Sequence, residues 1–341
     1  MIDNFYLHQM MKKSDRKNYL TNKHGVFTIT FPKKMKSNSR LKFIFKPGNT
    51  YVLKGEKLEN IELSFPNSNV LVEGIEFNQC QINVEGGSVN YYCDNKHNSI
   101  ATTKASKIFL SDYSDENFNG LPFTSEDLYL HNVCLTNSNN KSTTDILLRA
   151  SQNIVLDNCK LYFNVLSNVL ANPNQQIKIS CDKLSMENSI ISTILNKKSI
   201  KNNDNIGIND ESYFSILVSS KQIELENSSI ESGFNINVYS DNVILNKSLI
   251  GSIRNLEIDT KKIKLDNESD VVAIKPIFWE TYISEYDINR SQNDILYCSE
   301  RSLRNEKENS NNLFRTIEVL HNVKDTLTNE YENQNEKKNS R

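Results

Sequence analysis

The sequence predicts an all-β fold, a solenoid built from coils of about 20 residues, because one short pattern returns along the chain. The pattern is apolar, any, apolar, polar, Asn, small, and its two apolar positions are spaced as on a strand with one buried face. Few Gly-type hairpin turns separate the copies, so the strands are expected to pair with the next coil. The copies are "SEDLYLHNVCLT" (125–136), "SQNIVLDNCKLY" (151–162), "CDKLSMENSIIS" (181–192), "SKQIELENSSIE" (220–231), "SDNVILNKSLIG" (240–251) and "TKKIKLDNESDV" (260–271).

The period is measured from the first apolar residue of each copy. These anchors are Leu128, Ile154, Leu184, Ile223, Val243 and Ile263, and their sequence positions differ in turn by 26, 30, 39, 20 and 20. Continuing backward at the shorter spacing reaches Ile108, Val89 and Val70. The basic unit is therefore about 20 residues long. The three longer steps carry insertions at 136–144, 163–174 and 193–212.

Three short strands are predicted in each unit, because further apolar positions flank the anchored strand on both sides. Each strand is expected to pair in parallel with the same strand one coil away. The positions after the Asn are Leu135, Leu161, Ile191, Ile230 and Ile250. The pairs before the anchored strand are Leu147 and Arg149, Ile177 and Ile179, Ile216 and Val218, Ile236 and Val238, and Leu256 and Ile258.

The Asn of the pattern is predicted to occupy a sharp bend between two strands. Asn tolerates the left-handed backbone conformation that such a bend needs, and stacked Asn side chains form amide ladders. Lys247 interrupts the column. The predicted bend residues are Asn132, Asn158, Asn188, Asn227 and Asn267.

The copies "IVLDNCKL", "LSMENSII" and "IELENSSI" resemble the right-handed parallel β-helix superfamily, the pectate-lyase-like fold, over residues 41–273. The segment "FKPGNTYVLKG" (45–55) is similar to the strand that opens many such domains. The resemblance implies that a ligand lies along one sheet, walled by loops between coils. It also implies that lyases of this fold use clustered acidic residues for calcium and a base of Arg or Lys type.

Both ends of the stack are expected to be covered, since terminal coils expose apolar interior and strand edges. Residues 1–40 are predicted as an N-terminal cap that includes a short amphipathic helix within 1–20, and 274–299 as a C-terminal cap around Trp279. Residues 300–341 follow, with an amphipathic helix at 311–332 and a disordered tail. The apolar side of that helix is Leu313, Ile317, Leu320, Leu327 and Tyr331, with Lys324 interrupting it.

Composition restricts the possible partners. The net charge is −2, which gives no sign of nucleic-acid binding, and no segment approaches a membrane span. The N-terminus lacks the apolar run of a secretory signal, so we expect a cytoplasmic protein or one released without an ordinary signal peptide. None of the six cysteines forms a CxxC pair, so no metal or cofactor is predicted, and Cys134 and Cys159 fall in or near the small-residue position as free thiols.

The candidate binding face is the outer surface of the first strands, beside the three insertions. Its predicted outward residues are Ile146, Leu148 and Ala150; Gln176, Lys178 and Ser180; Ser215, Leu217 and Ser219; Asn235, Asn237 and Tyr239; and Asn255, Glu257 and Asp259. Of these, Lys178, Asn237, Tyr239, Glu257 and Asp259 are the candidate ligand-binding residues.

Arg149 is a sixth candidate. The register places it inward, where a buried Arg would need a partner such as Asp145, and a β-bulge that turns it outward is the favoured alternative. Arg149 and Lys178 would then bind an anion or a sugar carboxylate. His131 is interpreted as a surface residue.

The favoured function is a non-enzymatic scaffold that binds a protein or a glycan through this face. One alternative is a polysaccharide lyase or glycoside hydrolase, and another is a phage tail or secreted effector module. The 311–332 helix is expected to pack back on the solenoid, and the alternative is that it mediates self-association or binds a partner. An enzyme would need Asp or Glu side chains that converge under the loops, since glycoside hydrolysis uses two carboxyl groups that flank the scissile bond.

Overall fold

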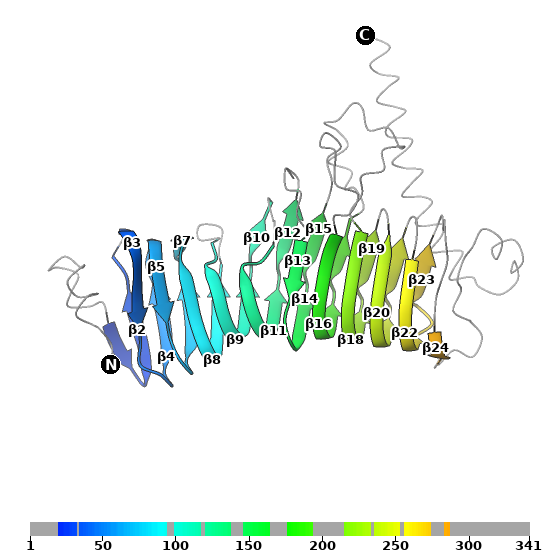
Figure 1. Cartoon of the computed structure of the whole chain (residues 1–341), viewed down its shortest axis with the longest axis horizontal. Helices are drawn as coiled ribbons and strands as arrows, with labels where there is room; N and C mark the ends of the chain where they lie inside the picture. The colour runs from blue at the N-terminus through cyan, green and yellow to red at the C-terminus, as the bar shows by residue number, and fades with distance from the viewer. Residues whose placement is uncertain are drawn as a thin grey trace, which may run out of the picture. The chain divides into compact units, whose positions relative to one another are not determined.

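The computed structural model describes residues 20–32, 34–93, 99–116, 120–137, 146–163, 176–193, 215–232, 235–252, 256–273 and 283–286. In this part of the chain the secondary structure is all-β, which confirms the predicted class, and most of the strands pair in parallel (Figure 1). No helix of membrane-spanning length and apolarity occurs among these residues. The predicted helices within 1–20 and at 311–332 lie outside the described residues except for Leu20, which belongs to a strand, so helical caps gain no support.

The strands group into two compact units that alternate along the sequence. Unit 1 takes its residues from 1–115, 120–134 and 149–159, and unit 2 from 116–119, 135–148 and 160–341. The strands of unit 1 are β1 (Leu20–Lys23), β2 (Val26–Thr30), β3 (Lys34–Ile44), β4 (Thr50–Lys54), β5 (Lys57–Ser64), β6 (Asn69–Glu73), β7 (Glu76–Asn78), β8 (Gln81–Tyr92), β9 (Thr102–Ser111), β10 (Ser114–Asp115), β11 (Phe123–His131) and β14 (Asn153–Asp157).

The strands of unit 2 include β12 and β13, each of which shares one end residue with unit 1. They are β12 (Cys134–Asn137), β13 (Ile146–Arg149), β15 (Lys160–Phe163), β16 (Gln176–Glu187), β17 (Ile190–Ser192), β18 (Ser215–Glu226), β19 (Ser229–Ser232), β20 (Ile236–Asn246), β21 (Leu249–Ser252), β22 (Leu256–Leu265), β23 (Asp270–Ala273) and β24 (Ile283–Tyr286).

The predicted anchors are register partners in parallel strands of both units. In unit 1, Val70 pairs with Val89, Val89 with Ile108, Ile108 with Leu128, and Leu128 with Ile154. In unit 2, Leu184 pairs with Ile223, Ile223 with Val243, and Val243 with Ile263. In unit 2 the first and second predicted strands of a repeat form one continuous strand in β16, β18, β20 and β22, so the prediction of three short strands is wrong there. The predicted third strands form a second parallel sheet, in which Leu161, Ile191, Ile230 and Ile250 are successive partners.

The cores follow the two-residue alternation of these strands. The anchors Ile154, Leu184, Ile223 and Ile263 are each 0% exposed. Full burial of such a side chain contributes about 1.5–3 kcal/mol, so a stack of them is the main source of stability in each unit. In unit 1 aromatic rings extend the core, where Phe45 stacks on Phe65 with centroids 4.3 Å apart.

Parallel pairing starts nearer the N-terminus than the resemblance implies. β4 is the strand expected to open the stack, but β2 pairs with its other edge, with Val52 opposite Thr28, so that expectation is wrong. β1 pairs antiparallel with β2 through the turn at His24 and Gly25, which both have positive φ. This hairpin gives β2 a partner on the edge that an opening strand would expose.

Opposite charges lie across from each other where strands β3 to β7 pair. Lys36 pairs with Glu59 at 2.8 Å, Lys42 with Glu62 at 2.7 Å and Lys54 with Glu73 at 2.7 Å, and Lys57 also contacts Glu76. Each pair joins direct register partners. Exposed pairs contribute little each, but a strand slipped by one residue would lose the whole set, so they favour one register.

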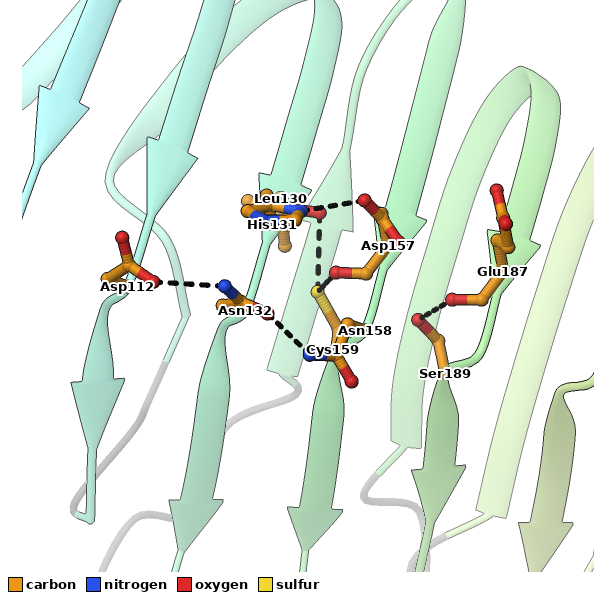
Figure 2. Close-up of polar contacts among 9 residues, drawn as sticks. All are labelled: Asp112, Leu130, His131, Asn132, Asp157, Asn158, Cys159, Glu187 and Ser189. Carbon is orange, nitrogen blue, oxygen red and sulfur yellow. Dashed lines mark hydrogen bonds and ion pairs between the residues drawn. The ribbon is translucent and has the colours of Figure 1, made fainter.

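The bend column is confirmed at four of its five predicted residues. Asn132, Asn158, Asn188 and Asn227 have φ between 45° and 52°. In unit 1, Asn132 Nδ2 donates to Asp112 Oδ1 at 3.1 Å and Asn158 Nδ2 donates to Asn132 Oδ1, which forms the expected ladder (Figure 2). Asp112, with φ of 56°, extends the column by one coil.

Asn267 does not adopt a positive φ, because this bend is built differently. Asp266 Oδ1 accepts hydrogen bonds from the Glu268 N–H at 3.1 Å and from the Ser269 hydroxyl at 2.6 Å. The aspartate side chain thus closes the turn in the way that Asx-turns do. The left-handed residue is not required there.

Lys247 keeps the left-handed conformation with φ of 49°, although it replaces Asn. A side chain without the local hydrogen bonding of Asn is disfavoured in this region. We therefore expect Lys247→Asn to raise the free energy of unfolding by about 0.5–1 kcal/mol. Urea denaturation would measure it, and the reverse change Asn227→Lys should lower the value by a similar amount. Equal stability of all three proteins would contradict this account of the bend.

Candidate ligand-binding face

Alternation in unit 2 places the predicted first-strand residues on one face of the sheet. Lys178, Leu217, Asn237 and Glu257 form a row of successive register partners, and all four are partly exposed. Ser180, Ser219, Tyr239 and Asp259 form the next row, and all four are exposed. Between the rows, Ile179, Val218, Val238 and Ile258 are 0–1% exposed and point into the core. The predicted outward orientation of these eight residues is confirmed.

The structure brings three of the candidate residues into contact at Glu257. Asn237 Nδ2 donates to Glu257 Oε2 at 3.1 Å, and the Tyr239 hydroxyl donates to Glu257 Oε1 at 3.4 Å. Both oxygens of the carboxylate are therefore engaged. Asp259, the register partner of Tyr239, lies beside them on the same face. We call Asn237, Tyr239, Glu257 and Asp259 the β20–β22 cluster.

The cluster combines the groups that polar ligands need. A carboxylate has lone pairs beyond those used here, the Asn amide has a carbonyl oxygen, and the Tyr hydroxyl can also accept. The Tyr239 side chain is 38% exposed, so its ring offers an apolar surface beside these polar atoms. Such an arrangement can hold a hydroxyl-rich ligand.

Lys178 is separated from the cluster by β18. It shares a row with Asn237, but Leu217 stands between them. Two strand spacings correspond to about 10 Å, so Lys178 would contact a different part of an extended ligand.

The placement predicted for β13 is wrong by one residue. Ile146 and Leu148 are each 1% exposed and Ala150 is 3% exposed, whereas Leu147 is 50% exposed and Arg149 is also exposed. Arg149 thus faces outward by ordinary alternation, and the predicted β-bulge is not needed. Arg149 belongs to unit 1, while the other five candidate residues belong to unit 2.

His131 is 52% exposed, as predicted, but its partner was missed. His131 Nδ1 lies 2.6 Å from Asp157 Oδ2, and the two residues are register partners on β11 and β14. Both stand three residues after their anchors, so the repeat alignment itself contained the signal. This pair connects the neighbouring strands β11 and β14 on the outer surface of unit 1.

None of the five described cysteines forms a disulfide, as expected, and burial is confirmed at four of them. Cys80, Cys93, Cys159 and Cys181 are buried, Cys134 is partly exposed, and Cys298 lies outside the described residues. Burial raises the pKa of the Cys80 thiol, which disfavours the reactive thiolate. Within the described ranges, no group of three or more His, Cys, Asp and Glu side chains could hold a metal ion. The three insertions lie almost wholly outside those ranges.

No protein-family model, curated protein or solved structure matches this chain. Any functional conclusion therefore rests on the geometry of the chain itself.

Proposed function

We propose that the chain is a right-handed parallel β-helix. In-register parallel strands that lie about 20 residues apart in the sequence support this. The left-handed bends between the long and the short strand of successive repeats, at Asn188, Asn227 and Lys247, support it as well. Handedness follows from the general preference, because crossovers between parallel strands of one sheet are right-handed in almost all proteins.

On this scaffold we infer a binding function without catalysis, and a glycan as the ligand. The observation that carries the proposal is the β20–β22 cluster, where an exposed tyrosine ring lies beside an ordered carboxylate and amide. Sugars present hydroxyls that pair with such groups, and their C–H faces pack on aromatic rings. The row of register partners that runs from Glu257 through Asn237 and Leu217 to Lys178 suits a chain-like ligand.

The geometry of the two acids favours binding over hydrolysis. Glu257 and Asp259 lie side by side on β22, on the same face, rather than on opposite sides of a ligand. Glycosidases need two carboxyl groups that flank the scissile bond. Glu257 accepts hydrogen bonds on both oxygens, which suits the orientation of ligand hydroxyls better than proton transfer.

The test is binding and turnover on a panel of neutral and acidic polysaccharides, with and without calcium. We expect at least one glycan to bind, and Tyr239→Ala and Glu257→Gln each to weaken it about tenfold, the effect of losing one good polar or ring contact. Glu187→Gln, an exposed glutamate on another surface of unit 2, is the matched control and should bind normally. New reducing ends or unsaturated uronate products would overturn the proposal, as would the absence of any bound glycan.

A further inference from the structure

The outer surface of the strands that carry the anchors in unit 1 has a row of partly exposed apolar side chains that the proposed function does not use. The row crosses β4, β6, β8, β9, β11 and β14, which lie side by side as register partners (Figure 1). Only its third position is polar. Its members, here called the apolar row, are Val52, Leu71, Asn90, Phe109, Tyr129 and Val155.

The same row in unit 2 has a different character. There the successive partners are Ser185, Glu224, Ile244 and Lys264. Two of these are charged, and Glu224 is engaged by Lys183 at 2.6 Å. An ordinary solvent-facing sheet surface is polar in this way, so the apolar character of the unit 1 row indicates a partner.

The aromatic members are arranged for an apolar partner rather than for a sugar. Phe109 and Tyr129 stack with centroids 4.5 Å apart and planes 7° from parallel. Each ring therefore covers one face of the other, and the second face of each ring is turned toward the next position of the row, Asn90 or Val155, rather than outward to a pyranose. An aliphatic side chain can still pack against the ring edges and against Leu71 and Val155.

We propose that the apolar row binds the 311–332 segment of a second copy of this chain as an amphipathic helix. That segment lies outside the described residues, and its sequence supplies the complementary pattern. Its positions at alternating spacings of four and three residues are Leu313, Ile317, Leu320, Lys324, Leu327 and Tyr331. Six positions on the helix therefore face six positions on the row.

The two patterns also agree in length and in polarity. Eighteen residues of helix span about 27 Å, and five strand spacings span about 24 Å. Lys324 is the fourth of the six helix positions and Asn90 is the third of the six row positions. They meet when the helix runs from Val155 toward Val52, which fixes the direction of the helix on the row.

We choose a second copy over an unrelated helix because the contact can then be reciprocal. Each chain carries one apolar row and one 311–332 segment, so a two-fold pair would make the same contact twice and would cover both. In the two-fold pair each chain contributes six positions of its 311–332 segment and the six positions of its apolar row, which makes twelve residues on each side. Stable interfaces have about 20–30 residues on each side, so we expect a weak dimer that depends on concentration.

Sedimentation velocity of the full-length chain over a concentration range tests this. We expect a concentration-dependent dimer, whose Kd rises at least about tenfold in Phe109→Thr and in Leu320→Glu, since each removes an apolar contact made twice. Asn90→Asp should lower Kd about two- to tenfold through an added charge pair with Lys324. Lys324→Asp should raise it, and the double variant Asn90→Lys with Lys324→Asp should restore it.

Ile244→Thr is the matched control, because it removes an apolar side chain from the same row position in unit 2 and should leave Kd unchanged. Far-UV circular dichroism of each variant establishes folding. A wild-type chain that stays monomeric would overturn the proposal, and so would a dimer indifferent to Phe109 and Lys324. These results are independent of glycan binding, because no row residue belongs to the β20–β22 cluster.

Discussion

Ile154→Asp is expected to unfold unit 1. It should lower the free energy of unfolding more than any other substitution proposed for this chain. Ile154 is 0% exposed and lies directly opposite Leu128 in the parallel register. A carboxylate there has no cationic or hydrogen-bonding partner from the apolar core, and burying an unpaired charge costs several kcal/mol. Typical domains are stable by only about 5–15 kcal/mol, so this loss removes most of the native population.

The measurement is a thermal melt followed by far-UV circular dichroism, with Val155→Asp as the control. Val155 is the next residue on β14 and is partly exposed on the opposite face. Its replacement should cost about 1 kcal/mol or less. A soluble Ile154→Asp chain that melts cooperatively near the wild-type temperature would show that β14 does not present Ile154 to the core.

The parallel register could be predicted from the sequence because parallel pairing gives the same strand of successive repeats the same environment. Leu128, Ile154, Ile223 and Val243 all occupy the same buried position of the repeat, where branched apolar side chains recur. The bend after it needs left-handed backbone, which explains why Asn recurs at 132, 158, 188 and 227. The backbone conformation of the bend and the pairing between strands therefore both appear in the sequence as one repeated pattern.

The predictions of inward and outward residues fail where the sequence pattern admits two alignments. "ILLRA" offers Ile146 and Leu148 or Leu147 and Arg149 as the inward pair, and the period is long and uncertain there because an insertion precedes β13. The burial of a cation should have decided between them, since Arg is costly inside a core.

The parallel strand β2 was not predicted for another reason. Tyr51 and Phe27 occupy the anchor register, and these aromatic residues hide the repeat.

The candidate face was predictable as a set of residues, whereas its contacts were not. Alternation places Asn237, Tyr239 and Glu257 on one side of the sheet, and this required only the period. The hydrogen bonds to Glu257 depend also on side-chain conformations, which a single sequence does not specify.

The small position after the Asn was expected to reflect packing, but in unit 2 it forms a buried hydrogen-bonded column. The Ser189 N–H donates to Ser228 Oγ at 3.0 Å, the Ser228 N–H to Ser248 Oγ at 3.1 Å, and the Ser248 N–H to Ser269 Oγ at 3.0 Å. Each of the first three hydroxyls donates to the carbonyl two residues earlier, as Ser189 does to Glu187 at 2.7 Å (Figure 2). All four serines are at most 4% exposed.

Ser228→Ala should therefore lower the free energy of unfolding by about 1–3 kcal/mol, the cost of leaving the buried Ser189 N–H without an acceptor. The Glu226 carbonyl that loses the Ser228 hydroxyl still accepts from the Asn188 N–H at 3.0 Å, so the orphaned donor accounts for most of the loss. Ser229→Ala, at the next and partly exposed position, should change stability by less than about 0.5 kcal/mol. Cys159 occupies the same slot in unit 1 and its thiol reaches the Asp157 carbonyl at 3.3 Å, so Ser228→Cys should be milder than Ser228→Ala. Urea denaturation of the three variants measures these differences. If the alanine and cysteine variants matched the wild type, the column would act through side-chain volume alone, and the hydrogen bonds would add nothing to the register of unit 2.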